Sequence, residues 1–363
     1  FDDDGQMIPY VGERKLSLFE AEHRLPIHNL KGKTRSKPVL SFNRNFSAPV
    51  IVEHKQTADE RLLLLAHDTD PFNRWEASRQ LAKEQLIAML TDGAAPDPAY
   101  LDALKRVLTD DALDPVFRGL ALQMPSDDDM AQTLADAGRT PDPVHIYATT
   151  QSLLKTIATQ TRPAFDAAYE AMAVPGPYTP DAKSAGMREL RLCALGYLSR
   201  IDGPARARAL FNSADNMTEK RAALSVLINQ NAGAAEVEAF YERWQNDATV
   251  LDKWFALQIG RSQPEHALDV AQALTKHERF SITTPNRFRS VIGAFIGNTA
   301  AFHAADGKGY AFVANWINRI DPINPRIAAR LATAFDTFAR YDGDRRSMML
   351  DAVAGMAQRN DVS

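Results

Sequence analysis

The sequence contains only one cysteine, Cys193, in 363 residues. A single cysteine cannot form an intramolecular disulfide bond. Residues 190–195 are mostly apolar, which is typical of a packed thiol, whereas a nucleophilic thiol needs a nearby base or a helix N-terminus. We therefore expect a reducing compartment and a cytoplasmic location.

Long apolar runs and blocks of like charge are also missing. Residues 62–66 are the best apolar candidate, but they are flanked by charge and are far shorter than the roughly 18 residues that span a bilayer. The net charge of -4 creates no field that would attract phosphate backbones. Neither a membrane nor a nucleic acid is therefore expected as a partner.

A zinc-peptidase motif is absent as well. H-E-x-x-H places two imidazoles one helical turn apart, so that both can bind a metal while the glutamate activates a water molecule. The nearest match runs from His277 to Ser281, and it has serine where the second ligand should be. The other histidines lie at no spacing that brings two to one helix face. The chain alone is predicted to have no catalytic residue and no cofactor.

Residues 1–55 differ in pattern from the rest. Residues 15–18, 25–28, 39–42 and 50–52 are short, partly alternating runs between charged or Gly/Pro breaks, which is typical of strands. Four strands are fewer than the seven or so of an immunoglobulin-like sandwich. We predict a partial β-sandwich domain over 1–55. Because the chain starts at Phe1 without an initiator methionine, we expect a piece of a longer polypeptide.

Residues 56–363 have helical spacing and form the second predicted domain. Thr57 followed by Glu60 is a capping signal, and Asp70-Pro71 and Thr284-Pro285 each place a capping residue before a proline. The same capping signal is found at Thr140-Pro141 and Thr179-Pro180. Helices are expected over 142–172, 178–200 and 323–340, among others. The fold class is therefore mainly α: an irregular, superhelical α-solenoid of ARM/HEAT-like form.

Eight stretches resemble the C-terminal half of the M1 family of zinc aminopeptidases, in the aminopeptidase N form of Gram-negative bacteria. They occur in the family's order along nearly the whole chain, at 40–50 (LSFNRNFSAPV), 70–77 (DPFNRWEA), 216–218 (NMT), 251–255 (LDKWF), 285–290 (PNRFRS), 293–295 (GAF), 302–310 (FHAADGKGY) and 324–325 (NP).

The resemblance implies the end of a small β-sandwich followed by a large helical domain. In this family a separate N-terminal domain carries the zinc and the catalytic glutamate. The chain would then be the non-catalytic C-terminal portion of an enzyme that releases N-terminal amino acids from peptides. It would enclose the active-site cavity and help to position and restrict substrates. Its partners would be that catalytic domain and short peptides, with zinc bound only in the missing domain.

The resemblance also implies candidate substrate-channel residues. The segment around Asn286 and Arg289, and the helix after Asn324-Pro325 with Arg326 and Arg330, would face the cavity. Arg289 and Arg330 would hold a peptide's carbonyl groups or C-terminal carboxylate through forked hydrogen bonds. Arg287 stays open between this role and a solvated helix start.

Other prominent residues favour structural roles. Trp75 and Trp254 are interpreted as packing anchors. Asp252 and Lys253 form either a structural ion pair or a surface pair. The alternative function is a free-standing α-solenoid scaffold that binds a protein on its concave face, with no peptidase role.

Overall fold

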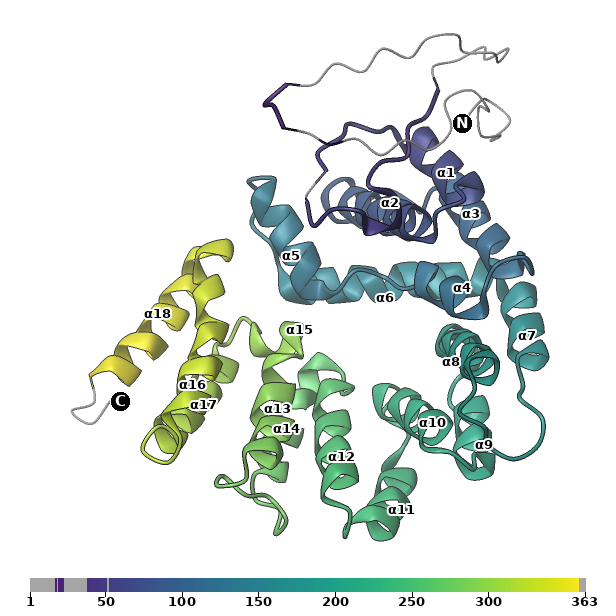
Figure 1. Cartoon of the computed structure of the whole chain (residues 1–363). Coiled ribbons are helices and arrows are strands. Elements are labelled where there is room, and N and C mark those ends of the chain that lie inside the picture. The colour runs from purple at the N-terminus through teal and green to yellow at the C-terminus, as the bar shows by residue number, and fades with distance from the viewer. Residues whose placement is uncertain (1–16, 18, 23–37, 51, 359–363) are drawn as a thin grey trace. The chain divides into compact units, whose positions relative to one another are not determined.

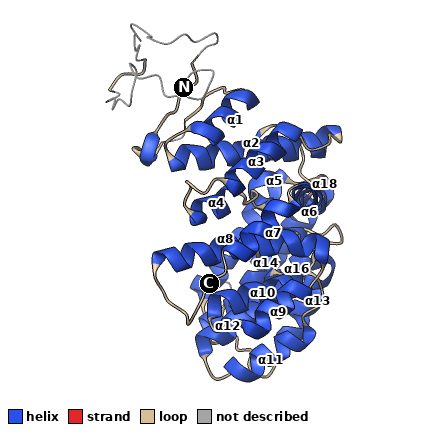
Figure 2. Cartoon of the chain, turned by 90° about the vertical axis from the view of Figure 1, so that its right-hand side faces the viewer, coloured by secondary structure: helices blue, strands red, loops and turns tan. Residues whose placement is uncertain are grey.

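The computed structural model describes residues 17, 19–22, 38–50 and 52–358. Within these ranges the chain forms helices and connecting loops and no strand, as Figure 2 shows. The mainly α fold expected from the sequence is confirmed. The chain divides into two compact units. One consists of the described residues up to Gln85 together with Pro96–Met124, and the other of Leu86–Ala95 together with the described residues from Pro125 onward.

The first unit is built on capped helices. Its elements are η1 (Arg44–Phe46), α1 (Ala58–His67), α2 (Pro71–Asp92, which continues into the second unit), α3 (Pro98–Thr109) and α4 (Pro115–Ala121). The predicted cap of α1 is a complete capping box: the Glu60 N–H donates to Thr57 Oγ1 at 3.2 Å and the Thr57 N–H donates to Glu60 Oε2 at 2.9 Å. Two N–H groups that the helix leaves unpaired are thereby satisfied.

The strand predicted at 39–42 does not form, and this prediction was wrong. A strand requires a hydrogen-bonded neighbour, and none of the described residues provides one. The chain turns instead into a short loop at Asn43, Asn45 and Phe46, all three with positive φ. Arg44 pairs with Asp68 at 2.6 Å and anchors this loop to the region where α2 begins. The predicted strand at 25–28 lies outside the described residues, as do most of 15–18 and Ile51 of 50–52.

The second unit is a long helical array. Its elements are α5 (Asp127–Asp136), α6 (Pro143–Gln160), α7 (Arg162–Ala171), α8 (Ala182–Asp202), α9 (Ala205–Ser213), α10 (Met217–Asn229), α11 (Ala234–Trp244), α12 (Ala248–Gly260), α13 (Pro264–Leu274), α14 (Pro285–Ile296), α15 (Thr299–Phe302), α16 (Lys308–Ile320), α17 (Pro325–Ala332), η2 (Thr333–Arg340) and α18 (Gly343–Ala357). Large apolar side chains fill its core, and burial of each contributes about 1.5–3 kcal/mol. The aromatic members that are almost fully buried are Phe165, Phe240, Phe255, Phe288, Phe295, Phe302, Tyr310 and Tyr341.

Alternate helices of this unit form a continuous series that closes on itself (Figure 1). α6 packs against α8, α8 against α10, α10 against α12 and α12 against α14, and α15 then packs against α5 and α6. Two ion pairs join the same ends of the array, Arg340 with Asp128 at 2.9 Å and Arg345 with Asp142 at 3.5 Å. The array is therefore closed by contacts between segments about 200 residues apart.

Several predicted helix boundaries need correction. The helix predicted over 142–172 is two helices, because Pro163 lacks an N–H and its ring clashes with a helix continued from α6. The caps of α6 and α8 are Asp142 and Asp181, whose side chains accept backbone N–H groups, rather than Thr140 and Thr179. The predicted helix 323–340 is α17 followed by the 3-10 helix η2.

Candidate functional site: the arginines of α14 and α17

The start of α14 presents one of the predicted pairs. Thr284 precedes Pro285 at the first helical position, as expected. Asn286 and Arg289 lie three residues apart, and both are exposed. The Arg289 guanidinium donates from Nη2 to Asn286 Oδ1 at 2.6 Å and from Nε to the Pro285 carbonyl at 3.3 Å. Asn286 therefore orients the charged end of Arg289.

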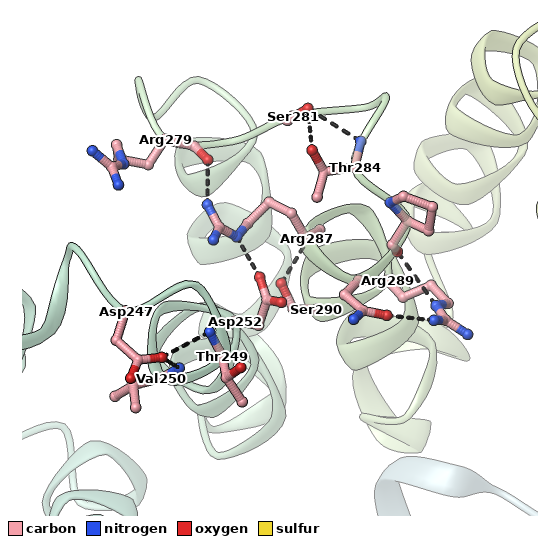
Figure 3. A network of polar contacts seen from close by, with 12 residues as sticks. Asp247, Thr249, Val250, Asp252, Arg279, Ser281, Thr284, Arg287, Arg289 and Ser290 are labelled. Carbon is pink, nitrogen blue, oxygen red and sulfur yellow. Dashed lines mark hydrogen bonds and ion pairs between the residues drawn. The ribbon is translucent and has the colours of Figure 1, made fainter.

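Arg287 lies between these two residues but has a different environment. Its side chain is 7% exposed, and Nε donates to Asp252 Oδ1 of α12 at 2.5 Å. Nη1 donates to the Arg279 carbonyl at 2.6 Å, and the guanidinium lies over the Phe255 ring at 5.1 Å. In Figure 3 the Arg287 side chain points toward Asp252, and Arg289 points away from both. Arg287 therefore forms a structural ion pair. Its partner is Asp252, which pairs with Arg287 of α14 and not with Lys253.

The second predicted pair lies on α17. Asn324 caps this helix by accepting the Ile327 N–H at 3.2 Å, and Arg326 and Arg330 follow one turn apart. Both side chains are exposed, and among the described residues neither guanidinium has a hydrogen-bond or ion-pair partner. α14 and α17 both pack against α16. The structure thus brings together Asn286 with Arg289, and Arg326 with Arg330, and no hydrogen bond between described residues joins the two pairs.

The H-E-x-x-S segment belongs to an aromatic cluster. His277 lies 5.2 Å from the rings of Tyr241 and Trp254 and 5.5 Å from Phe255. Burial lowers the pKa of His277. Trp254 is 5% exposed and donates from Nε1 to the Val237 carbonyl at 2.9 Å, as expected of a packing anchor. Within the ranges that the structure describes, no group of three or more His, Cys, Asp or Glu side chains could hold a metal ion.

Two other candidates also have structural explanations. Burial raises the pKa of the Cys193 thiol to about 12, so it remains protonated at neutral pH and is a poor nucleophile. Gly307 caps α16 in a left-handed conformation with φ of 65°. A Cβ on Gly309 would lie 2.6 Å from the Phe302 carbonyl oxygen. The glycines around Lys308 therefore permit a tight packing of α16 on α15.

Comparison with known proteins places this helical array in a family. The family described as a domain of unknown function (DUF3458_C) with ARM repeats matches residues 58–363. The chain belongs to the DUF3458_C family. Outside this match lie residues 1–57, which include the predicted sandwich domain.

Relatives of this DUF3458_C chain include several bacterial aminopeptidases. The aminopeptidase N of Caulobacter vibrioides is 36% identical over 322 residues, which are 86% of this chain and 36% of that protein. Aminopeptidase N of Escherichia coli is 29% identical over 369 residues, which are 97% of this chain and 41% of that protein. The matched stretch is the C-terminal portion of these proteins. The chain thus spans about two-fifths of the length of the curated relatives it matches.

A solved structure agrees with these sequence comparisons. The crystal structure of Legionella pneumophila aminopeptidase A, in complex with aspartic acid, superposes with a TM-score of 0.80 at 28% identity. The match covers 89% of this DUF3458_C chain and 39% of the Legionella chain. Among the described residues, no helix is both long enough and apolar enough to cross a membrane.

Sequence reasoning missed one polar cluster that links distant helices. His303 is 4% exposed, and its Nδ1 lies 2.9 Å from the Tyr310 hydroxyl. Arg345 donates from Nε to the His303 carbonyl at 2.7 Å and also pairs with Asp142. Burial, followed by the charges of Arg345 and Arg340, lowers the pKa of His303 to about 3. The only signal in the sequence was a histidine inside an apolar, aromatic stretch.

Proposed function

We propose that this chain is the non-catalytic C-terminal portion of a zinc-dependent aminopeptidase that releases N-terminal amino acids from peptides. The observation that carries the proposal is the similarity to aminopeptidase N along 86–99% of this chain, which corresponds to 36–41% of each relative. The zinc and the catalytic glutamate would belong to the remaining portion of the enzyme. The described residues do not fit a zinc site, since they bring no suitable ligands together.

The role proposed for the helical array is to enclose the active-site cavity. The closed series of helices in the second unit supports this role, because contacts between the two ends of the series leave it continuous. Such a wall would admit short peptides and keep folded proteins away from the catalytic centre. Neither a nucleic acid nor a membrane has a part in this function.

Arg289 and Arg330 are the residues proposed to hold a peptide's carbonyl groups or its C-terminal carboxylate. Both are exposed, and neither forms an ion pair with a carboxylate of the described residues. A guanidinium forms strong charge-assisted hydrogen bonds with a carboxylate. Arg326 would add positive charge one turn from Arg330. Asn286 would act indirectly, because its Oδ1 accepts the Arg289 hydrogen bond.

A hydrolysis assay on the purified chain tests whether it lacks peptidase activity of its own. The chain with added zinc should release no chromophore from an alanyl or leucyl chromogenic amide. A separately produced catalytic portion should bind the chain, and its peptidase activity should then rise or change in selectivity. Turnover by the chain alone that a chelator abolishes would overturn the proposal. Failure of the two parts to associate would favour the free-standing scaffold.

Two finer assignments belong to the same proposal. Residues 1–55 would belong to a β-sandwich whose other strands lie in the remainder of the enzyme, and those strands would supply the partner that the described residues do not give to 39–42. The single cysteine supports a cytoplasmic location. Cell fractionation with an antibody against this chain tests the location, and recovery in a periplasmic or extracellular fraction would contradict it.

A further inference from the structure

Arg200, near the end of α8, is a largely buried cation in a polar network shared by three neighbouring helices. Its Nη1 donates to the Gly196 carbonyl of the same helix, and its Nη2 lies 3.4 Å from Gln151 Oε1 of α6. On the side of α10, Gln230 donates from Nε2 to the Ser199 carbonyl. The two hydrogen-bond acceptors of this guanidinium are therefore both neutral, a backbone carbonyl and an amide oxygen.

No carboxylate of the described residues forms an ion pair with Arg200. Buried arginines are rarely found without one, because removing a charge from water is costly unless an opposite charge compensates. Burial lowers the pKa of Arg200, and the groups that act on its charge are Tyr197, Tyr147 and Cys193, none of which is a carboxylate. The other half-buried arginine of the same helix, Arg191, pairs with Glu219 at 3.2 Å.

Hydrogen-bonding groups in the segments that meet at Arg200 are also left without partners. Four buried side-chain atoms from α6, the end of α8 and the end of α10 have no hydrogen-bond partner among the described residues: Thr150 Oγ1, Ser199 Oγ, Arg200 Nε and Gln230 Oε1. Thr150 and Ser199 are 5% and 2% exposed. Buried polar atoms are nearly always paired, so four such atoms on adjacent helices call for a bound species. Three of the four can donate a hydrogen bond.

The charge balance favours an anion as that species. The Gly196 carbonyl neutralises only part of a full positive charge. Burial, and after it the charges of Glu265 and Asp127, raise the pKa of Tyr147, but neither carboxylate forms an ion pair with Arg200. A water molecule would satisfy the hydroxyl groups but would leave the guanidinium charge uncompensated.

We propose that Arg200 binds a small monovalent anion, of the size of chloride or a carboxylate group, between α6, α8 and α10. Arg200 Nε would supply the charge-assisted hydrogen bond, and the Thr150 and Ser199 hydroxyls would donate the others. This site is separate from the exposed arginines of α14 and α17. It would stabilise the junction of these three helices whether or not the chain takes part in peptide hydrolysis.

Bromide is the probe for a direct test. Crystals of the full chain soaked in sodium bromide should show an anomalous peak within hydrogen-bond distance of Arg200 Nε. Bromide replaces chloride in such sites and scatters anomalously, whereas water does not. A map with water only at Arg200, while bromide appears at other arginines, would overturn the proposal.

Thermal unfolding in matched salts gives a second test. At equal ionic strength, wild-type chain should unfold about 2–4 °C higher in chloride or acetate than in gluconate, which is too large for the site. Arg200→Met should remove this difference, and the paired arginine variant Arg191→Met should keep it. A stronger effect of acetate than of chloride would identify a carboxylate as the preferred anion. An equal response of both variants would contradict the proposal, and the bromide map decides alone if Arg200→Met does not fold.

Discussion

Arg287 and Asp252 form a charged hydrogen bond of 2.5 Å that joins α14 to α12, and Arg289, two residues along α14, takes no part in it. The two side chains lie on nearly opposite faces of α14, because an α-helix turns by about 100° per residue. Arg287 is 7% exposed and is held by three different groups, whereas Arg289 is exposed and is held only by its own helix. The two arginines therefore provide a matched pair of substitutions.

The first prediction concerns stability. Arg287→Met should lower the free energy of unfolding by about 2–4 kcal/mol, because it leaves Asp252 without its partner in a mostly buried place. Arg289→Gln should change it by less than about 0.5 kcal/mol, as is usual for an exposed residue. Urea unfolding followed by circular dichroism measures both. Equal losses in the two variants would contradict the assignment of Arg287 as structural.

The second prediction concerns the glycine at the start of α16. Gly309→Ala should destabilise the chain by about 1–3 kcal/mol, because a Cβ would lie 2.6 Å from the Phe302 carbonyl oxygen and backbone must move. Gly355→Ala is the matched control. It lies in α18 with nothing within 4 Å of a Cβ, and alanine favours helix by up to about 1 kcal/mol there. If Gly309→Ala left the free energy of unfolding unchanged, α16 and α15 would pack less closely than the structure shows.

The third prediction concerns acid stability. The pKa of His303 is about 3 in the folded chain and 6.5 for an ordinary histidine, so the unfolded chain binds more protons between these pH values. Stability should therefore fall as the pH drops from 6.5 toward 3. His303→Gln should show a shallower fall over this window in urea unfolding at several pH values.

Asp127 has the opposite effect and is present in both proteins. Burial raises its pKa from 3.8 to about 6, so the folded chain binds more protons there and gains stability as the pH falls through 6. At each pH, subtracting the free energy of unfolding of His303→Gln from that of the wild type cancels the contribution of Asp127, because both proteins contain it. Parallel pH curves for the two proteins would show that His303 is accessible to protons in the folded chain.

Local signals in the sequence located much of the array. The Thr57–Glu60 capping box and the proline after Asp70 gave correct helix starts, because both depend on neighbours within four residues. Pro163 is also a local signal. Because it was overlooked, α6 and α7 were predicted as a single helix. The strand predicted at 39–42 failed because strand formation depends on a partner strand and not on the segment's own pattern.

Long-range pairings could not be predicted in the same way. The partner of Arg287 lies 35 residues away and that of Arg340 lies 212 residues away, and no sequence pattern specifies either. The sequence therefore identified Arg287 and Arg289 as a charged helix start without showing which of them points to α12. The environment of Arg200 could not be predicted for the same reason, since only the fold shows that no carboxylate of the described residues forms an ion pair with it.

The last prediction tests the arginines proposed to hold a peptide. In the complete enzyme, Arg289→Gln and Arg330→Gln should each raise KM for a tripeptide with a free C-terminal carboxylate by about 10-fold, since a charge-assisted hydrogen bond contributes about 1.5–3 kcal/mol. The same tripeptide with an amidated C-terminus should show little change. Arg287→Met is the control. Any loss of activity in this variant should result from lower stability and should therefore be equal for the two peptides. Equal KM changes for the free and amidated peptides in Arg289→Gln and Arg330→Gln would show that neither guanidinium recognises the carboxylate.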